Sequence, residues 1–361
     1  MSRVLKIAVI EGDGIGPEVI REAMAVAEAA AALGETQLEW NLFPWGTEYY
    51  RRHGEMAERN FIAQLRKYDA ILLGAVGHPD VQDHVTLNGL LLPIRRRFDQ
   101  FICLRPAYLF TGIESPLRDK APTSIDMLIY RENTEGEYAN VGGRVYQETS
   151  HDIAIQTSVF TRRGCERIIR SAFEAASHRP RQRLASITKS NAQGHGMVLW
   201  DETFRDVARE FPQVATESLL IDRAVMEFVR RPEAFDVVVA SNLFGDILTD
   251  LAAIVVGSMG LAASANINPA REHPSMFEPV HGSAPDIVGQ EIANPLAAIL
   301  SAAMMLDHLQ QPQAAAAIHW AVASLLAENG PRTPDLGGNS STSEVGAEIV
   351  QRIRGANLSA F

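Results

Sequence analysis

The segment 235–250 constrains the fold more than any other part of the chain, because a strand pattern runs directly into a helix pattern there. The run from Phe235 to Ala240 is apolar and rich in β-branched residues, which is typical of a parallel strand buried on both faces. The residues from Asn242 to Asp250 follow as the start of a helix. Strands that alternate with helices in this way predict an α/β protein.

Two carboxylates, Asp246 and Asp250, lie four residues apart on this predicted helix. The spacing puts both on one helical face, within reach of a single hard cation. They also follow the carboxyl end of a strand, where open α/β sheets bind their ligands. An aspartate in the first helical turn is, however, commonly a cap or a dipole partner, which would explain Asp246 without a metal. The pair alone leaves both readings open.

Length, charge and cysteine content bound the class of protein. A chain of 361 residues is long enough for two lobes, since single cores stop growing at roughly 250 to 300 residues. The net charge of -11 argues against a nucleic-acid binder. Cys103 and Cys165 are too few for a disulfide framework, so we expect a reduced, cytoplasmic location. We expect no targeting signal, and no membrane span either, because the apolar run 296–306 is too short.

The N-terminal segment predicts a strand, a glycine turn and a helix. The strand covers 6–10, and the helix opens at Pro17 and runs to Leu33 before Gly34. The turn between them has the spacing G-x-G-x-G and not G-x-G-x-x-G, and Pro17 removes a backbone donor that would face a pyrophosphate. The turn is therefore a weak dinucleotide fingerprint, although it can line a ligand cleft.

The remaining strands alternate with helical patterns, which again indicates an α/β fold. Strands are predicted at 70–73, 125–130, 153–160, 184–188 and 236–240. Residues 133–156 differ, because they are rich in glycine, strand-like and polar. This segment predicts a projecting hairpin that pairs with a partner subunit. A long surface loop is the alternative.

Three arginines, Arg95, Arg105 and Arg131, occur in apolar sequence contexts. A guanidinium presents a rigid donor fork that matches a carboxylate, so converging arginines suit a dicarboxylate substrate. Any single one is more often a structural ion-pair partner. Lys189 follows the predicted strand 184–188, and Asp222 follows the apolar run 219–221 in the same manner. A lysine in a closed cleft can serve as a base, whereas a surface lysine and a helix cap are the simpler readings.

The loop 277–287 combines small residues, a histidine and an acid. Gly282, Ser283 and Ala284 allow a flat, phosphate-bearing ligand to approach the backbone closely. Asp286 would accept hydrogen bonds from ribose hydroxyls and repel a 2′-phosphate, which favours NAD over NADP.

Together these motifs resemble the β-decarboxylating dehydrogenase family, which includes isopropylmalate, isocitrate, homoisocitrate, tartrate and D-malate dehydrogenases. The resemblance extends from the Gly-Asp-Gly-Ile-Gly-Pro-Glu turn to the Thr333–Gly338 loop, which is nearly the whole chain. It implies the two-domain isopropylmalate/isocitrate dehydrogenase-like fold, with a mostly parallel sheet and not a standard Rossmann fold. The large cofactor-binding domain would comprise 1–100 and 257–361. The small domain for dimerisation, metal and substrate would comprise 101–256.

The resemblance also implies a set of site residues. These are Tyr138, Lys189 and Asp222 for catalysis; Arg95, Arg105, Arg131 and Asn88 for substrate; Asp222, Asp246 and Asp250 for metal; and His281, Gly282, Ser283, Ala284, Asp286, Ile287 and Asn294 for the cofactor. The implied cofactors are NAD and Mn²⁺ or Mg²⁺, with K⁺ as a further candidate. The implied partner is a second copy of the chain, which would contribute Lys189 and Asp222 to each active site.

The segment before Arg95 faces the third carbon of the substrate in this family. Gly89 and Leu91 stand where isocitrate enzymes place Ser and Asn, and Asn88 stands where isopropylmalate enzymes place a glutamate. The whole pattern most resembles the tartrate and D-malate dehydrogenases. It departs from relatives at Ile102-Cys103, where an Asn is common. We therefore expect NAD-dependent oxidation and oxidative decarboxylation of tartrate, meso-tartrate or D-malate. The alternatives are 3-isopropylmalate as substrate, a regulatory subunit, and a redox-neutral decarboxylase.

Overall fold

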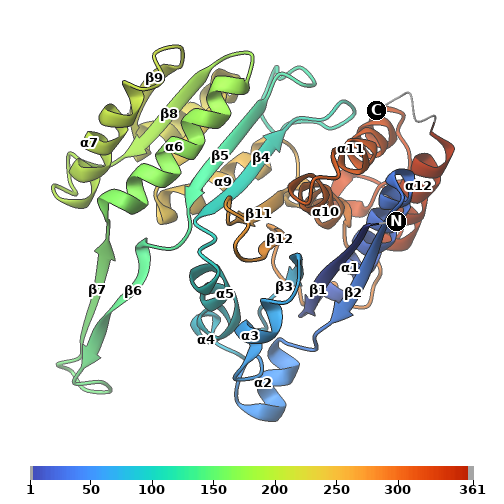
Figure 1. Cartoon of the computed structure of the whole chain (residues 1–361), viewed down its shortest axis with the longest axis horizontal. Coiled ribbons are helices and arrows are strands. Elements are labelled where there is room, and N and C mark those ends of the chain that lie inside the picture. The colour runs from blue at the N-terminus through green and yellow to red at the C-terminus, as the bar shows by residue number, and fades with distance from the viewer. Residues whose placement is uncertain (1–2, 357–361) are drawn as a thin grey trace.

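A ten-stranded sheet runs through the computed structural model, which describes residues 3–356 (Figure 1). The strand order is β2-β1-β3-β12-β11-β4-β5-β10-β8-β9. The strands are β1 (Arg3–Gly12), β2 (Thr36–Leu42), β3 (Ala70–Ala75), β4 (Ile102–Tyr108), β5 (Asp126–Glu132), β8 (Arg183–Thr188), β9 (Ala215–Leu220), β10 (Val237–Ala240), β11 (Ala263–Ile267) and β12 (Ser275–Pro279). The pairs β12–β11, β11–β4 and β4–β5 are antiparallel and the others are parallel. The predicted α/β class with a mostly parallel sheet is confirmed.

Helices cover the sheet and connect its strands, as the alternating pattern predicts. They are α1 (Gly16–Ala31), α2 (Thr47–His53), α3 (Phe61–Leu65), α4 (Asp83–Thr86), α5 (Leu92–Arg97), α6 (Arg162–His178), α7 (Gly196–Ala208), α8 (Ile221–Arg230), α9 (Asn242–Val255), α10 (Leu296–His308), α11 (Pro312–Ala327) and α12 (Thr342–Gly355). A π-helical turn, Leu87–Leu91, joins α4 to α5. No helix within residues 3–356 has both the length and the apolar character to cross a membrane.

The two halves of the sheet are formed by different parts of the sequence. The five from β2 to β11 in the strand order come from 1–100 and 257–361, and the five from β4 to β9 come from 101–256. α1 packs with α10 and α12 over the first group, and α6 packs with α7 over the second. Because one sheet continues across the boundary, the division into two domains stays a prediction.

The strand–helix unit at 235–250 is at the centre of the second group. Val237, Val238 and Val239 are fully buried, because β10 lies between β5 and β8 and is covered on both faces. This position explains the continuous apolar run in the sequence. It also places the start of α9 beside the carboxyl end of β5.

The segment 133–156 contains most of a hairpin that projects from the sheet (Figure 1), as predicted, and is not a surface loop. β6 (Gly136–Val145) pairs antiparallel with β7 (Ile153–Val159). Several of its apolar side chains, including Val145 and Ile155, are exposed. An arm of this shape with apolar side chains in water is typical of a segment that pairs with another chain.

His308 provides a test of the packing between α10 and the sheet. Its ring lies 5.6 Å from that of Phe277 on β12, and burial lowers its pKa from an ordinary value of 6.5 to about 4. The folded state therefore prefers neutral His308, so its contribution to stability is complete above pH 6.5 and is lost as the pH falls towards 4. We expect His308→Asn to lose less thermal stability than the wild type between these pH values. His151→Asn, at an exposed histidine of the hairpin, should behave like the wild type, and equal losses in all three proteins would contradict the assignment.

Candidate active site

A cavity of about 770 Å³ opens where α5, β6 and α9 meet the central strands β4 and β5. Six of the predicted site residues line it, namely Asn88, Arg95, Arg105, Arg131, Tyr138 and Asp246. They come from six different elements of the fold and lie up to 158 residues apart in the numbering from Asn88 to Asp246. Cys103, the departure noted on β4, is fully buried with its Sγ 3.6 Å from Ser264 Oγ. It does not line the cavity.

The three arginines are buried, and each has a protein partner as well as a place in the cavity wall. Arg95 Nη2 donates to Glu278 Oε1 at 2.8 Å, and Arg105 Nη1 donates to Thr249 Oγ1 at 2.6 Å. Arg131 Nη2 donates to Asn242 Oδ1 at 2.8 Å. Each arginine can therefore be both a structural partner within the protein and a ligand-binding residue, because these partners hold the guanidinium groups in place around one cavity. Three guanidinium groups on one cavity suit a dicarboxylate.

Asp246 is the central acceptor of the cavity. Its Oδ1 forms an ion pair with Arg131 Nη1, and its Oδ2 accepts a hydrogen bond of 2.9 Å from the Tyr138 hydroxyl. Burial alone would raise the pKa of Asp246, but Arg131, Arg105 and the Tyr138 hydrogen bond hold it below its usual value. The carboxylate is therefore ionised. It does not cap α9, which excludes the reading of Asp246 as a simple helix cap.

Tyr138 is held in its protonated form. Burial and then the neighbouring Asp246 carboxylate raise the pKa of Tyr138 to about 12. The Arg131 guanidinium lies 5.6 Å from the centre of the ring. At neutral pH the phenol therefore keeps its proton, which it donates to Asp246, and the side chain lies in the cavity wall.

Two residues that the sequence reading missed shape this arrangement. Glu137 accepts hydrogen bonds from Ser241 Oγ at 2.8 Å and from the backbone N–H of Leu243 at 3.1 Å, so its carboxylate caps α9 and ties it to β6. Gly245 lies against Arg131, and a Cβ there would come within 2.5 Å of Arg131 Cγ. The sequence did contain a signal for Gly245, because a glycine inside a helix and beside a site aspartate often has a packing or functional reason.

Asp250 lies one turn beyond Asp246 on the same face of α9, as the spacing predicts. Its Oδ1 is 3.6 Å from Arg105 Nη1, and its side chain is exposed. Two carboxylates beside a cavity fit part of the oxygen ligand set of a hard divalent cation. Within residues 3–356, however, no group of three or more His, Cys, Asp or Glu residues could hold a metal ion.

Lys189 and Asp222 form a pair of their own. Lys189 Nζ donates to Asp222 Oδ1 at 2.6 Å, and this hydrogen bond lowers the pKa of Asp222. Neither residue lines the cavity of the arginines. The predicted catalytic and metal residues thus fall into two groups within a single chain.

The predicted cofactor loop follows β12 and packs against the N-terminal glycine turn. The backbone N–H of Ile15 donates to Ser283 O at 2.9 Å, and Gly14, with φ of +62°, approaches the same carbonyl so closely that a Cβ would clash. This contact explains the glycine at position 14 of the turn.

Several groups in the cofactor loop fit a nucleotide. Among the described residues, His281 Nε2 is buried without a hydrogen-bond partner, and burial lowers the pKa of His281, which keeps the ring neutral. Asp286 is exposed, and its carboxylate has no ion pair within residues 3–356. Asn294 differs, because its amide donates to Asp335 Oδ2 at 2.9 Å and accepts from the Leu296 N–H at 3.0 Å. Its side chain therefore has a structural role at the start of α10.

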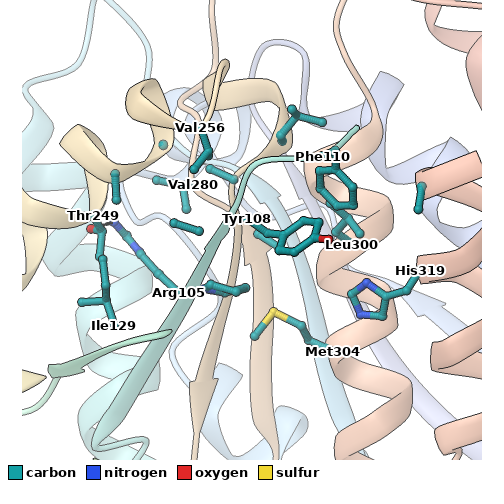
Figure 2. Close-up of a pocket in the computed structure, with 18 of the residues that line it drawn as sticks. Arg105, Tyr108, Phe110, Ile129, Thr249, Val256, Val280, Leu300, Met304 and His319 are labelled. Atoms are coloured by element: carbon teal, nitrogen blue, oxygen red, sulfur yellow. Dashed lines mark hydrogen bonds between the residues drawn. The ribbon is translucent and has the colours of Figure 1, made fainter. Parts of the chain in front are cut away.

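A second cavity, of about 450 Å³, lies between α9, α10 and α11 and also reaches Arg105. Figure 2 shows Arg105 and Thr249 at one side of it and His319 with Met304 at the other. The rings of Tyr108 and Phe110 meet edge to face in its wall, 4.9 Å apart. Its mostly apolar lining does not suit a dicarboxylate, which leaves the larger cavity as the candidate substrate site.

Comparisons with known proteins agree with this geometry. The family model described as isocitrate/isopropylmalate dehydrogenase matches residues 6–349. The chain belongs to this family. The predicted family resemblance is thereby confirmed, and so is a fold distinct from the standard Rossmann fold.

Several members of the isocitrate/isopropylmalate dehydrogenase family are similar to the chain over nearly their whole length. A D-malate dehydrogenase (decarboxylating) of Escherichia coli is 50% identical and a probable tartrate dehydrogenase/decarboxylase of Agrobacterium vitis is 47% identical, over 98% and 99% of this chain and 99% of each relative. A 3-isopropylmalate dehydrogenase of Thermobifida fusca is 48% identical over 98% of both chains. The crystal structure of isocitrate dehydrogenase from Methylococcus capsulatus matches with a TM-score of 0.87 and 34% identity, over 97% of this chain and 99% of that chain.

Proposed function

We propose that this family member is an NAD-dependent dehydrogenase that oxidises and decarboxylates small 2-hydroxy dicarboxylic acids, namely tartrate, meso-tartrate or D-malate, with a divalent metal. The observation that carries the proposal is the convergence of three arginines, a protonated tyrosine and an ionised aspartate on one cavity. The names of the D-malate and tartrate relatives support the same reaction.

In the proposed reaction Arg95, Arg105 and Arg131 hold the carboxylates of the substrate. Lys189, assisted by Asp222, receives the proton of the substrate hydroxyl as C2 is oxidised. When bound, NAD would accept the hydride from C2, and Mn²⁺ or Mg²⁺ held by the aspartates would polarise the C2 oxygen. Loss of CO₂ then leaves an electron pair on C3, and the Tyr138 hydroxyl delivers the proton that completes the product. A requirement for K⁺ stays a prediction.

A homodimer with shared active sites is part of the proposal. Lys189 and Asp222 are paired with each other outside the cavity, so the partner chain would bring them to the other subunit's Asp246. Exposed apolar side chains favour such an assembly, since Met226 on α8 is 62% exposed and Ile247 on α9 is 48% exposed. Two-fold symmetric dimers are the commonest soluble oligomers.

One observation favours 3-isopropylmalate as the second candidate substrate. Leu87, Leu91 and Leu92 line one wall of the cavity, where they would pack against an isopropyl group. The Asn88 amide, in the same wall, donates to the carbonyl of His84 at 2.8 Å, and its oxygen could accept from the C3 hydroxyl that tartrate has and 3-isopropylmalate lacks.

The test is a set of initial rates with NAD⁺ and Mn²⁺ for L-tartrate, meso-tartrate, D-malate and 3-isopropylmalate. Faster NADH formation with tartrate or D-malate supports the proposal, and a clear preference for 3-isopropylmalate overturns the substrate assignment. Release of CO₂ without NADH would instead indicate a redox-neutral decarboxylase. No turnover with any of the four would favour a regulatory subunit.

The metal assignment predicts a loss of Mn²⁺ affinity in Asp250→Asn. Removing one carboxylate from a set of oxygen ligands should raise the Kd for Mn²⁺ roughly tenfold or more, while an exposed side chain leaves the fold intact. Calorimetric titration with Mn²⁺ measures the change. Asp307→Asn, at an exposed acid of α10, is the matched control. Equal Mn²⁺ affinity in the two variants would show that Asp250 is not a ligand.

The cofactor assignment predicts that Asp286→Asn gains activity with NADP⁺. The exposed carboxylate repels a 2′-phosphate, and the amide removes that charge. We expect the ratio of kcat/KM for NADP⁺ to kcat/KM for NAD⁺ to rise roughly tenfold. An unchanged ratio would place the ribose away from this residue.

A further inference from the structure

Arg95 and Arg96, adjacent on α5, have partners on opposite sides of the cavity. Arg95 reaches Glu278 on β12, which belongs to the group of strands from 1–100 and 257–361. Arg96 Nη2 donates to the backbone carbonyl of Tyr138 on β6. Successive residues of a helix point about 100° apart, which lets a six-residue helix contact both sides.

The Arg96 hydrogen bond meets β6 where the strand is irregular. The hairpin register shifts between Gly136 and Val141, and no ladder pair is formed by the residues between them. Asn140 has a φ of +54° in the same stretch. A bulged strand leaves backbone groups without ladder partners. The Arg96 guanidinium supplies a charge-assisted bond to one of them.

The three contacts of Tyr138 come from two parts of the chain, namely the segment 101–256 and α5. The phenol donates to Asp246 on α9, and the ring lies under Arg131 of β5. Both partners belong to 101–256. The third contact comes from Arg96 on α5, the helix whose first residue, Leu92, forms a wall of the cavity with Leu91. It connects the wall that faces the C3 substituent with the strand that carries the proton donor.

We propose that Arg96 is a positioning residue that fixes the backbone of Tyr138, so that the phenol delivers its proton to C3 of the substrate. This inference rests on the proposed function. Arg96 is half-buried and is not among the residues that line the cavity, so it acts through Tyr138 and not on the substrate. Its loss should affect the proton delivery that follows substrate binding, because the carboxylates stay held by Arg95, Arg105 and Arg131.

The experiment compares Arg96→Met with Arg97→Met, which removes the same charge from an exposed position of the same helix. We expect kcat for the preferred substrate to fall roughly tenfold or more in Arg96→Met while KM changes less than about threefold. Arg97→Met should match the wild type. Arg96→Lys, which restores one charged donor, should recover part of kcat.

A second readout distinguishes positioning from general damage to the site. If proton delivery becomes slow, the kinetic isotope effect of substrate deuterated at C2 should fall in Arg96→Met, because hydride transfer no longer limits the rate. Equal kcat in the two methionine variants, an unchanged isotope effect, or no recovery in Arg96→Lys would overturn the inference. If Arg96→Met does not fold, Arg96→Gln replaces it in the same comparison. A wild type without NAD-dependent oxidation of any substrate would instead overturn the proposed function.

Discussion

Arg131→Lys should lower kcat/KM for the dicarboxylate substrate roughly 10²-fold or more. Lysine keeps the positive charge but cannot reproduce the planar fork that reaches Asn242, Asp246 and a substrate carboxylate together. Disrupting one partner of a buried, hydrogen-bonded charge pair costs about 2 to 5 kcal/mol, and each 1.36 kcal/mol or so is tenfold in rate. Arg131 is only 2% exposed, so its guanidinium contacts are made inside the protein and a lysine there would leave some of its acceptors unpaired.

Steady-state kinetics with the preferred substrate measure this effect. Arg163→Lys, at an exposed position of α6, is the matched control and should keep the wild-type kcat/KM. Thermal unfolding of both variants separates a loss of activity from a loss of fold. An Arg131→Lys enzyme within threefold or so of the wild type would mean that Arg131 serves only as the structural partner of Asp246.

Hybrid dimers of Tyr138→Phe and Lys189→Met subunits should regain activity that neither parent has. Each homodimer lacks a proton donor or a proton acceptor in both sites and should lose roughly 10²- to 10⁴-fold in kcat. In a hybrid, one site collects both substitutions and the other collects none, provided that each site joins Tyr138 of one chain to Lys189 of the other. Random reassembly of an equal mixture makes about half of the dimers hybrid, which restores about a quarter of the sites.

The mixture is compared with each parent protein after the same dissociation and reassembly. A doubly substituted chain, Tyr138→Phe with Lys189→Met, mixed with the wild type is the control for reassembly itself. A mixture of the two single variants that stays as inactive as its parents would show that Tyr138 and Lys189 act within one chain. The salt-bridged pair Lys189–Asp222 would then have to move to the cavity of its own subunit.

Local sequence patterns predicted six of the strands and the first helix closely, but five strands of the sheet, namely β2, β4, β9, β11 and β12, were not predicted. The strand predicted at 6–10 extends over Arg3–Gly12, and the helix predicted at 17–33 covers Gly16–Ala31 before a short 3-10 turn. Such elements follow from the period of apolar residues and from proline and glycine at their ends. The boundaries shifted by a few residues because backbone pairing with neighbours, such as β2 and β3 beside β1, extends a strand beyond its apolar run.

The sequence predicted which residues form the site, but only some of the contacts between them. Helical spacing placed Asp246 and Asp250 on one face, and both are within 4 Å of Arg105. Nothing local in the sequence indicated that Glu137 caps α9 or that Arg96 donates to the carbonyl of Tyr138. These contacts depend on how β6 leaves the sheet, which is a property of the assembled fold.

The sequence by itself determined the α/β class, the family, and the supply of arginines, acids and a tyrosine, because periodicity and motif spacing are encoded within short stretches of chain. Only the tertiary structure decided which of these residues meet. Arg131 and Asp246 are 115 residues apart and form an ion pair because β10 lies beside β5 in the sheet. Lys189 and Asp222 are drawn together at the other side of β10, since β8 and β9 are neighbours there. Strand order sets these distances, and strand order results from the packing of the whole chain.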